Sequence, residues 1–319
     1  MVLTSTGSPA GLISTFLADR RRSPRRPKER TPHPRFRSQK ELPAEPAPAG
    51  LRPRKSLGQH FLTDRHILRR IVTAAKLAAD DTVVEVGAGL GVLTGQLLRR
   101  AGKVIAVEVD EGLCAHLRHR FEGSSNLSLV CDDILSLNPG DLLRSAGAKP
   151  PYVVAGNLPY NIAAAVLRLF LEAPDRPQRM IVMLQKEVGE SIVAQPGRMG
   201  LLGLSVQLYA VPRLLFTVPS SSFRPPPKVE SAVLRIDVRE TPAVPVDDVE
   251  SFFRLLRAGF SAPRKQLRNA LSHALGVDPP LTGDALRRAG IDPSLRAQAL
   301  GLEQWAALYH AFELEGKRP

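Results

Sequence analysis

An apolar run stands directly before three closely spaced glycines in this chain. The run is Thr82–Val86, and Gly87, Gly89 and Gly91 follow it. This pattern is typical of a buried strand that passes through a tight turn into a helix, here expected near Val92–Arg100. A strand–turn–helix unit cannot bury its own apolar faces, so it needs neighbouring strands and covering helices. The turn therefore predicts an α/β sheet.

The next hundred residues repeat the alternation of apolar runs with helical patterns. Further strands are expected at 104–109, 127–130, 152–155 and 180–184, and further helices at 111–121, 162–171 and 187–193. Strands that are apolar throughout indicate a parallel sheet covered on both faces. Residues 229–238 instead alternate, with Ala232, Leu234, Ile236 and Val238 on one face. That alternation predicts an antiparallel strand that closes the edge of the sheet.

Beyond about residue 246 the pattern is helical only. Short helices are expected at 249–258, 263–275, 281–289 and 302–312, with Gly, Asp and Pro between them. We therefore place a boundary near residue 242. An α/β domain is predicted over 51–242 and a small all-α domain over 243–319.

Charge divides the chain unevenly. The formal net charge is +13, and residues 1–50 carry +6 of it, from 10 Lys/Arg and 4 Asp/Glu. This segment is rich in proline and poor in apolar residues, so it is expected to be a disordered basic extension. It could be a product of an upstream start codon or a neutral tail, an arm that touches RNA phosphates, or an organelle transit peptide. The basic excess suggests a polyanionic partner, with nucleic acid ahead of an anionic membrane surface.

Several classes of protein are excluded by composition. No run approaches ~18 uninterrupted apolar residues, so no membrane-spanning helix is expected. Two cysteines, Cys114 and Cys131, exclude a disulfide framework and a four-cysteine zinc site. No cluster of His, Cys and Asp has metal-ligand spacing, so no metal is predicted.

The glycine turn and two acidic residues indicate a nucleoside cofactor. Glu108 follows Gly87 by 21 residues and ends the second strand, where it can accept hydrogen bonds from both ribose hydroxyls. The third glycine of a dinucleotide motif would fall at Val92, which disfavours NAD. Glu85 would repel a pyrophosphate but suits a sulfonium cation, so S-adenosylmethionine is the expected ligand. The alternative is that the glycines serve only a tight turn.

Two neighbouring aspartates follow the third strand. Asp133 is expected near the adenine amino group of the cofactor, and Asp132 leaves its register open. Asp133 could also be a loop or capping residue.

Residues 157–160, Asn-Leu-Pro-Tyr, end the fourth strand at the carboxyl edge, where open α/β sheets bind ligands. An exocyclic aromatic amine is a poor nucleophile because its lone pair is delocalised. The Asn157 side-chain oxygen and the Leu158 carbonyl would favour a pyramidal amine with a localised lone pair. Pro159 stiffens the turn, and Tyr160 offers a face on which a flipped-out adenine can stack. Alternatively, Asn157 caps the next helix and Tyr160 is packing.

Two further segments flank this site in the sequence. Gln59 and His60 could reach the methionine part of the donor, or they belong to a loop that leads to a helix capped by Asp64, with Ile67 and Ile71 on its buried face.

The second segment is a stiff, proline-rich loop before the last strand. Its Phe223 could close the other side of the adenine pocket, or it could cover the core. Arg224 and Lys228 of the same loop are expected near phosphate.

A basic segment lies in the helical part of the chain. Residues 251–275 contain no Asp or Glu, and their basic residues are Arg254, Arg257, Arg264, Lys265 and Arg268. Arg264, Lys265 and Arg268 are the candidates for RNA phosphates on short helices. The alternative is a solvated helix surface.

Taken together, five segments of residues 51–315 resemble the ribosomal RNA adenine dimethyltransferase family, which acts on small-subunit RNA. The segments are Leu57–Leu62, Glu85–Gly89, Asn157–Tyr160, Phe223–Val229 and Phe260–Asn269. The resemblance implies a Rossmann-like class I methyltransferase domain, a helical RNA-binding domain, and S-adenosylmethionine without a metal. It also implies transfer of four methyl groups to two adjacent adenosines near the 3′ end of small-subunit rRNA during ribosome biogenesis. A cytoplasmic monomer that acts on the pre-small ribosomal subunit is expected.

The resemblance assigns residues by position. The donor-binding positions are matched by His60, Leu62, Gly87, Glu108, Asp133 and Asn157, with Gly89 added from the glycine turn. The target-base pocket is matched by Asn157, Leu158, Tyr160 and Phe223, with Pro159 between them. The family more often has Asn at position 60, and the 50-residue extension is not part of its pattern.

Three alternatives remain. A large-subunit rRNA adenine methyltransferase of the macrolide-resistance type shares the fold and chemistry, although Ile is expected there in place of Leu158. A ribosome-assembly or transcription factor could use the same fold without catalysis. An NAD-dependent oxidoreductase is disfavoured by Val92.

Overall fold

The glycine-rich turn lies at the centre of a seven-stranded mixed sheet. The computed structural model describes residues 53–54 and 58–313, so the extension predicted for residues 1–50 lies outside it. The strand order is β4-β3-β2-β5-β6-β9-β7. The parallel strands are β2 (Thr82–Val86), β3 (Lys103–Glu108), β4 (Leu127–Cys131), β5 (Tyr152–Asn157) and β6 (Arg179–Gln185). The antiparallel strands are β7 (Ala210–Val218) and β9 (Ser231–Val238).

The chain order reverses between β2 and β5. From β2 the chain adds β3 and β4 on one side, and it then returns to place β5 on the other side of β2. Ligands of open α/β sheets bind at such a reversal, beside the carboxyl ends of the strands. The glycine turn after β2 and the Asn-Leu-Pro-Tyr turn after β5 therefore meet at one place.

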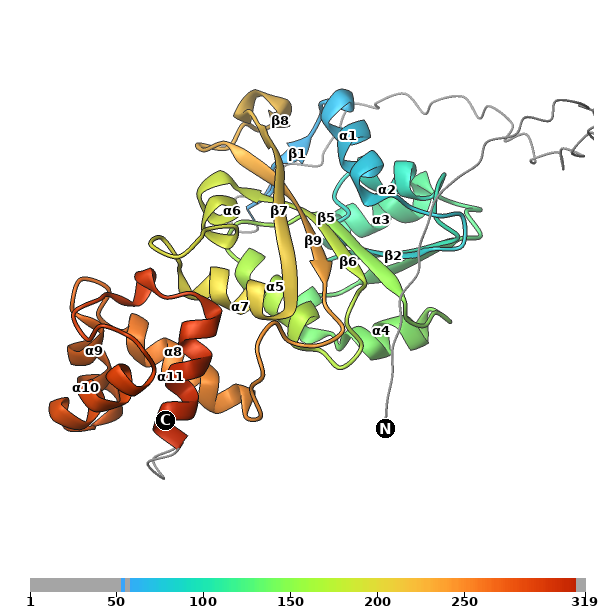
Figure 1. Cartoon of the computed structure of the whole chain (residues 1–319). Helices are drawn as coiled ribbons and strands as arrows, with labels where there is room; N and C mark the ends of the chain where they lie inside the picture. Colours follow the sequence, from blue (N-terminus) through green and yellow to red (C-terminus); the bar gives the residue numbers. More distant parts are fainter. Residues whose placement is uncertain (1–52, 55–57, 314–319) are drawn as a thin grey trace, which may run out of the picture. The chain divides into compact units, whose positions relative to one another are not determined.

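Helices cover both faces of the sheet, as the apolar strands predicted (Figure 1). One face packs against α5 (Ala163–Glu172) and α7 (Leu201–Tyr209), through Val84, Val154 and Val182. The other face packs against α1 (Arg65–Ala75) and α2 (Val92–Leu97). The remaining elements of this part are α3 (Glu111–Arg120), α4 (Pro139–Ser145), α6 (Lys186–Ile192), and a two-stranded sheet of β1 (Phe61–Leu62) and β8 (Phe223–Arg224).

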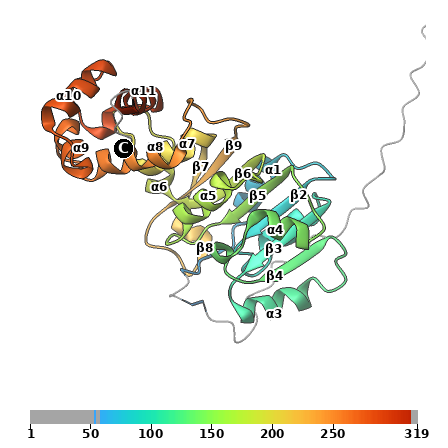
Figure 2. The same ribbon diagram turned by 90° about the horizontal axis from the view of Figure 1, so that it is seen from below.

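Four helices follow the sheet, as expected. They are α8 (Val249–Phe260), α9 (Leu267–Leu275), α10 (Pro279–Arg288) and α11 (Leu302–Glu313), and Figure 2 shows them grouped together. Trp305 of α11 is fully buried, and its ring fills the space that the missing Cβ of Gly259 leaves on α8. Of these helices, α8 and α11 contact α7.

The structure corrects the sequence predictions at several points. β9 does not close the sheet, because it lies between β6 and β7. The true edge strand, β7, was missed because Pro212 and Arg213 interrupt its apolar pattern, and an edge strand tolerates proline. Helices α4 and α7 were also missed. Most of α7 is buried, so it has no polar face to give a helical period.

The helix predicted from residue 263 begins only at Leu267. Residues 261–266 form a loop between α8 and α9.

Candidate active site

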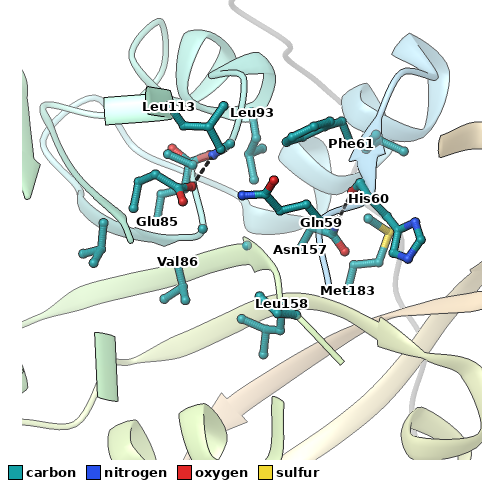
Figure 3. Close-up of a pocket in the computed structure, with 18 of the residues that line it drawn as sticks. Gln59, His60, Phe61, Glu85, Val86, Leu93, Leu113, Asn157, Leu158 and Met183 are labelled. Atoms are coloured by element: carbon teal, nitrogen blue, oxygen red, sulfur yellow. Dashed lines mark hydrogen bonds between the residues drawn. The ribbon is translucent and has the colours of Figure 1, made fainter. Parts of the chain in front are cut away.

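One pocket brings the predicted site segments together at the carboxyl edge of the sheet (Figure 3). From the segment before α1 it is lined by Gln59, His60, Phe61 and Leu62, and from the glycine turn by Gly87, Ala88 and Gly89. Asn157, Leu158, Pro159 and Tyr160 line it from the turn after β5, and Glu85, Glu108, Asp132 and Asp133 also lie along it. Segments separated by up to a hundred residues thus share one cavity.

Two glycines bring the turns after β2 and β5 into close contact. A Cβ at Gly156 would lie 2.5 Å from the carbonyl oxygen of Val86, so only glycine fits between these strands. Gly87 has φ +72°, a left-handed conformation that glycine adopts without strain. A Cβ at Gly87 would lie 3.7 Å from the carbonyl oxygen of Asn157. The strand–turn–helix pattern indicates Gly87 but not Gly156, whose role depends on the neighbouring strand.

Glu108 organises the far wall of the pocket. Its side chain is only 5% exposed, and burial raises its pKa. Oε2 accepts a hydrogen bond from the Gly89 N–H at 2.8 Å, and Oε1 accepts one from the Asp110 N–H at 3.0 Å. Each carboxylate oxygen can accept a second hydrogen bond. The carboxylate therefore fixes the glycine turn and still has acceptor capacity for a ligand.

Glu85 is a buried acid beneath the same pocket. It is 1% exposed, and burial raises its pKa to about 8, with the nearby charge of Glu108 adding a smaller contribution. Within the described residues, its Oε2 has no hydrogen-bond partner. An ionised buried carboxylate is costly unless an opposite charge lies close to it. The pocket is thus built to favour a cationic ligand.

The Asn157 side chain has one bonded end and one open end. Its Nδ2 donates to the carbonyl oxygen of His60 at 3.0 Å (Figure 3). Because a carbonyl can only accept, the nitrogen end must face His60, which leaves Oδ1 as an acceptor. No described residue donates to this Oδ1 or to the carbonyl of Leu158. The capping alternative is wrong, since α5 begins at Ala163 with Ile162 as its N-cap.

Tyr160 is held from two directions. Its hydroxyl lies 2.8 Å from the Oγ of Ser231, and its ring stacks against the imidazole of His60 with centroids 6.0 Å apart. The His60 Nδ1 lies 2.8 Å from the carbonyl oxygen of Pro225, which requires Nδ1 to be the donor. His60 thus links the segment before α1 to the proline-rich loop. Nothing in the local sequence around Ser231 indicates this contact.

Phe223 does not line the pocket. It is 1% exposed and packs with Ile67, Ile71 and Val218 in the core beneath α1. This is the arrangement that the core alternative describes. Leu62, which pairs with Phe223 between β1 and β8, does line the pocket.

The two aspartates after β4 both line the pocket. Asp132 Oδ1 accepts hydrogen bonds from the Asp133 N–H at 2.7 Å and the Ser136 hydroxyl at 3.2 Å. Asp133 Oδ1 accepts one from the Leu135 N–H at 3.0 Å and begins the 3₁₀ turn Ile134–Ser136. Each aspartate therefore keeps its Oδ2 as an acceptor for a ligand, and these hydrogen bonds do not choose between them.

The basic candidates lie on two loops and one helix. Arg224 and Lys228 are exposed on the loop that includes β8. Arg264 and Lys265 are exposed in the loop between α8 and α9, not on a helix as expected. Arg268, on α9, is partly buried and close to Gly283 of α10.

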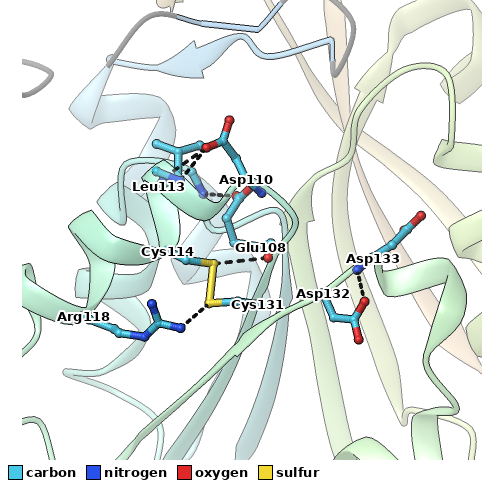
Figure 4. The surroundings of a disulfide bond; sticks show 10 residues. Glu108, Asp110, Leu113, Cys114, Arg118, Cys131, Asp132 and Asp133 are labelled. Carbon is cyan, nitrogen blue, oxygen red and sulfur yellow. Dashed lines mark hydrogen bonds between the residues drawn. A yellow bond between two sulfur atoms is a disulfide. The ribbon is translucent and has the colours of Figure 1, made fainter. Parts of the chain in front are cut away.

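A disulfide joins Cys114 of α3 to Cys131 at the end of β4 (Figure 4). The Cα atoms are 6.0 Å apart, a normal separation for such a bridge. The composition excludes a framework of several bridges, but the pairing of these two residues was not predicted. It depends on α3 packing beside β4. Cys131 pairs with Glu108 across β4 and β3, and the Sγ of Cys114 lies 3.4 Å from the carbonyl oxygen of Glu108.

Two other structural features are absent from the described residues. No helix among these residues is long and apolar enough to cross a bilayer. Residues 53–54 and 58–313 hold no group of three or more His, Cys, Asp or Glu side chains that could bind a metal ion.

Most of this chain is similar to known ribosomal RNA methyltransferases. The family model for ribosomal RNA adenine dimethylase matches residues 50–313. A ribosomal RNA small subunit methyltransferase A of Dehalococcoides mccartyi is 48% identical over 258 residues, which cover 81% of this chain and 88% of that protein. The protein of the same name from Moorella thermoacetica is 42% identical over 266 residues, covering 81% of this chain and 92% of the relative.

Two solved structures share the fold. A dimethyladenosine transferase from Plasmodium falciparum superposes with a TM-score of 0.68 at 25% identity, over 81% of this chain and 99% of that one. The 23S rRNA methyltransferase ErmE superposes with a TM-score of 0.62 at 27% identity, over 79% of this chain and 99% of that one. The class I methyltransferase fold is therefore confirmed, and the chain belongs to the ribosomal RNA adenine dimethylase family.

Proposed function

We propose that this protein transfers methyl groups from S-adenosylmethionine to the exocyclic amines of two adjacent adenosines near the 3′ end of small-subunit rRNA. The observation that carries the proposal is the position of Asn157. Its amide nitrogen is bound to His60, so its Oδ1 is an acceptor in the same pocket as Gly87 and Glu108. An amine held by this oxygen would be close to a donor held by the glycine turn.

The residues of the pocket fit the donor. When bound, S-adenosylmethionine supplies an electrophilic methyl group on a positively charged sulfur. Glu108 would accept hydrogen bonds from the ribose hydroxyls, and Asp133 from the adenine amino group. The left-handed glycines, Gly87 and Gly89, let the backbone approach the ligand closely. The buried Oε2 of Glu85, which has no hydrogen-bond partner among the described residues, favours a positive charge near it. His60 and Leu62 border the same pocket.

The turn after β5 would prepare the adenine amine. Asn157 Oδ1 and the Leu158 carbonyl accept its hydrogens and favour a localised lone pair, while Pro159 stiffens the turn. The base stacks on Tyr160, whose hydroxyl is already fixed by Ser231. Rate enhancement comes from alignment and electrostatics, and the amine proton leaves to water after methyl transfer. In this scheme no side chain has to act as a strong base.

RNA binding is assigned to the basic loops. Arg224 and Lys228 lie on the loop beside the pocket, and the helical segment over 243–319 presents Arg264, Lys265 and Arg268. We take 51–242 and 243–319 as methyltransferase and RNA-binding domains. The pre-small ribosomal subunit is the proposed partner, the cytoplasm the proposed compartment, and a monomer the proposed state.

Two other functions compete with this one. The likeness to a 23S rRNA methyltransferase is compatible with a large-subunit target. The names of the relatives that are more than 40% identical favour the small subunit, and so does Leu158. A role in ribosome assembly without catalysis does not need the open acceptor of Asn157.

Mass mapping of modified adenosines tests the proposal. rRNA of both subunits would be compared from cells with the protein, without it, and with Asn157→Ala. Dimethyladenosine near the small-subunit 3′ end is expected only with the unaltered protein. A modified adenosine in the large subunit would assign the alternative target. Normal ribosome assembly with no modified base in any strain would assign the non-catalytic role.

A further inference from the structure

Helix α1 has two faces of opposite character. Leu68 and Ile71 on its inner face line the pocket. Its outer face is exposed and basic, with Arg65, Arg69 and Arg70. No Asp or Glu occurs from Arg65 to Ala79. The helix is therefore at once a wall of the site and a strip of positive surface.

The charges on this face are not neutralised by neighbours. Arg65 and Arg69 form no ion pair with any residue in the described part of the chain. They are four positions apart, so they are neighbours on one side of the helix. Arg70 has a different role, because its guanidinium lies 3.6 Å from the centre of the Phe216 ring. Arg65 and Arg69 remain as two exposed cations.

The basic surface continues to the mouth of the pocket. In the β1–β8 sheet, Phe61 pairs with Arg224, and α1 begins three residues after Leu62. Figure 1 shows α1, β1 and β8 close together. The cations of α1 and Arg224 therefore lie beside the segment Gln59–Leu62, which lines the pocket.

We propose that the exposed face of α1 binds the RNA backbone, with Arg65 and Arg69 on phosphates next to the adenosine that enters the pocket. This rests on the proposed function. RNA fits the face better than a lipid surface does, because a membrane-binding helix needs a free apolar face. The apolar face of α1 is already buried, through Ile67, Leu68, Ile71 and Val72.

The test compares two double variants that remove the same charge. Arg65→Gln/Arg69→Gln alters the proposed surface. The control is Arg100→Gln/Lys149→Gln, which changes exposed residues shortly before β3 and β5, at the edge of the sheet opposite the pocket. Binding of a small-subunit 3′-hairpin RNA would be measured by fluorescence anisotropy from 50 to 400 mM salt.

The first variant should weaken RNA binding roughly tenfold at about 0.1 M salt, since two phosphate contacts are lost. It should also lower the slope of log affinity against log salt by about 1.4 to 1.8, from roughly 0.7 to 0.9 per contact. The control should match the unaltered protein. S-adenosylmethionine affinity and melting temperature should be unchanged in both variants.

If the two variants bind RNA with equal affinity and equal salt dependence, the proposal that α1 binds the RNA backbone is wrong. If the unaltered protein modifies small-subunit rRNA normally in that case, only this inference fails. If it modifies no adenosine there, the proposed function fails, whatever α1 binds.

Discussion

The hydroxyl oxygen of Tyr160 lies 2.8 Å from the Oγ of Ser231, although 71 residues separate them in the sequence. Ser231 is fully buried at the start of β9, where it pairs with Gln185 of β6 and Val218 of β7. The hydrogen bond fixes the polar end of a side chain whose residue lines the pocket. A base stacked on Tyr160 would thus be positioned in part by β9, which is separated from β2 by β5 and β6 in the sheet.

Removing this hydrogen bond should slow methyl transfer without affecting the donor. Tyr160→Phe and Ser231→Ala should each reduce the methylation rate about fivefold, since a neutral hydrogen bond contributes ~1 kcal/mol. The double variant should be no slower than either single one, because both changes remove the same contact. Single-turnover rates and donor affinity measured by calorimetry would check this. Additive losses would show that Ser231 acts through something other than Tyr160.

Asn157→Ala should abolish most of the activity. It removes the open acceptor Oδ1 and the bond to the His60 carbonyl. A loss of about 100-fold in rate is expected, comparable with deletion of a preorganised transition-state contact. Asn161→Ala is the matched control, because this exposed neighbour does not line the pocket. Equal activity of both variants on the rRNA would contradict the role of Asn157.

Donor binding should release protons near neutral pH. Burial raises the pKa of Glu85 to about 8, so the donor-free protein holds this carboxyl largely protonated at pH 7. A cation in the pocket favours the ionised form and lowers the pKa. Calorimetry in buffers of different ionisation enthalpy should detect the released proton. Glu85→Gln should release fewer protons, because the group that ionises is removed. Unchanged proton release in this variant would exclude Glu85.

The raised pKa of Glu85 also predicts how the stability of the donor-free protein depends on pH. Because the pKa of Glu85 is higher in the folded than in the unfolded state, the folded state binds more protons between these two values. The contribution of Glu85 to the free energy of unfolding is therefore complete below the pKa of Glu in the unfolded chain, and it is lost as the pH rises towards 8. The unfolding free energy of Glu85→Gln should therefore fall less over pH 5–8 than that of the unaltered, donor-free protein. A steeper fall in the variant would reverse the assigned sign.

Reduction of the Cys114–Cys131 bridge should destabilise the oxidised protein. The bridge closes a loop with a sequence separation of 17, for which the chain-entropy estimate is about 3 kcal/mol. Denaturant unfolding with and without dithiothreitol would measure the difference. The double variant Cys114→Ser/Cys131→Ser is the control and should not respond to dithiothreitol. An equal response of both proteins would mean that the effect lies elsewhere.

Charge reversal in the loop between α8 and α9 should weaken rRNA binding. Arg264→Glu/Lys265→Glu is the cleaner variant, because both residues are exposed whereas Arg268 is partly buried against α10. Lower RNA affinity, a weaker salt dependence and unchanged donor affinity are expected. If the variant binds RNA as tightly as the unaltered protein does, the loop does not contact RNA and is only a solvated surface.

The sequence alone determined the strand–turn–helix unit at Gly87, the Asn157–Tyr160 turn, and their meeting at one edge of the sheet. These features follow from local preferences and from one rule, that parallel strands present their carboxyl ends together. The positions of Glu108 and Asp133 beside the pocket follow from the same rule, since each comes at or just after the end of a strand.

Only the tertiary structure decided which distant residues support the site. The edge position of β7, the contact of Gly156 with Val86, the Ser231–Tyr160 hydrogen bond and the burial of Phe223 all depend on partners far away in the sequence. A local pattern shows how a segment can fold, but it carries no information about which strand or side chain will pack against it. Packing free energy, summed over the whole core, makes that choice.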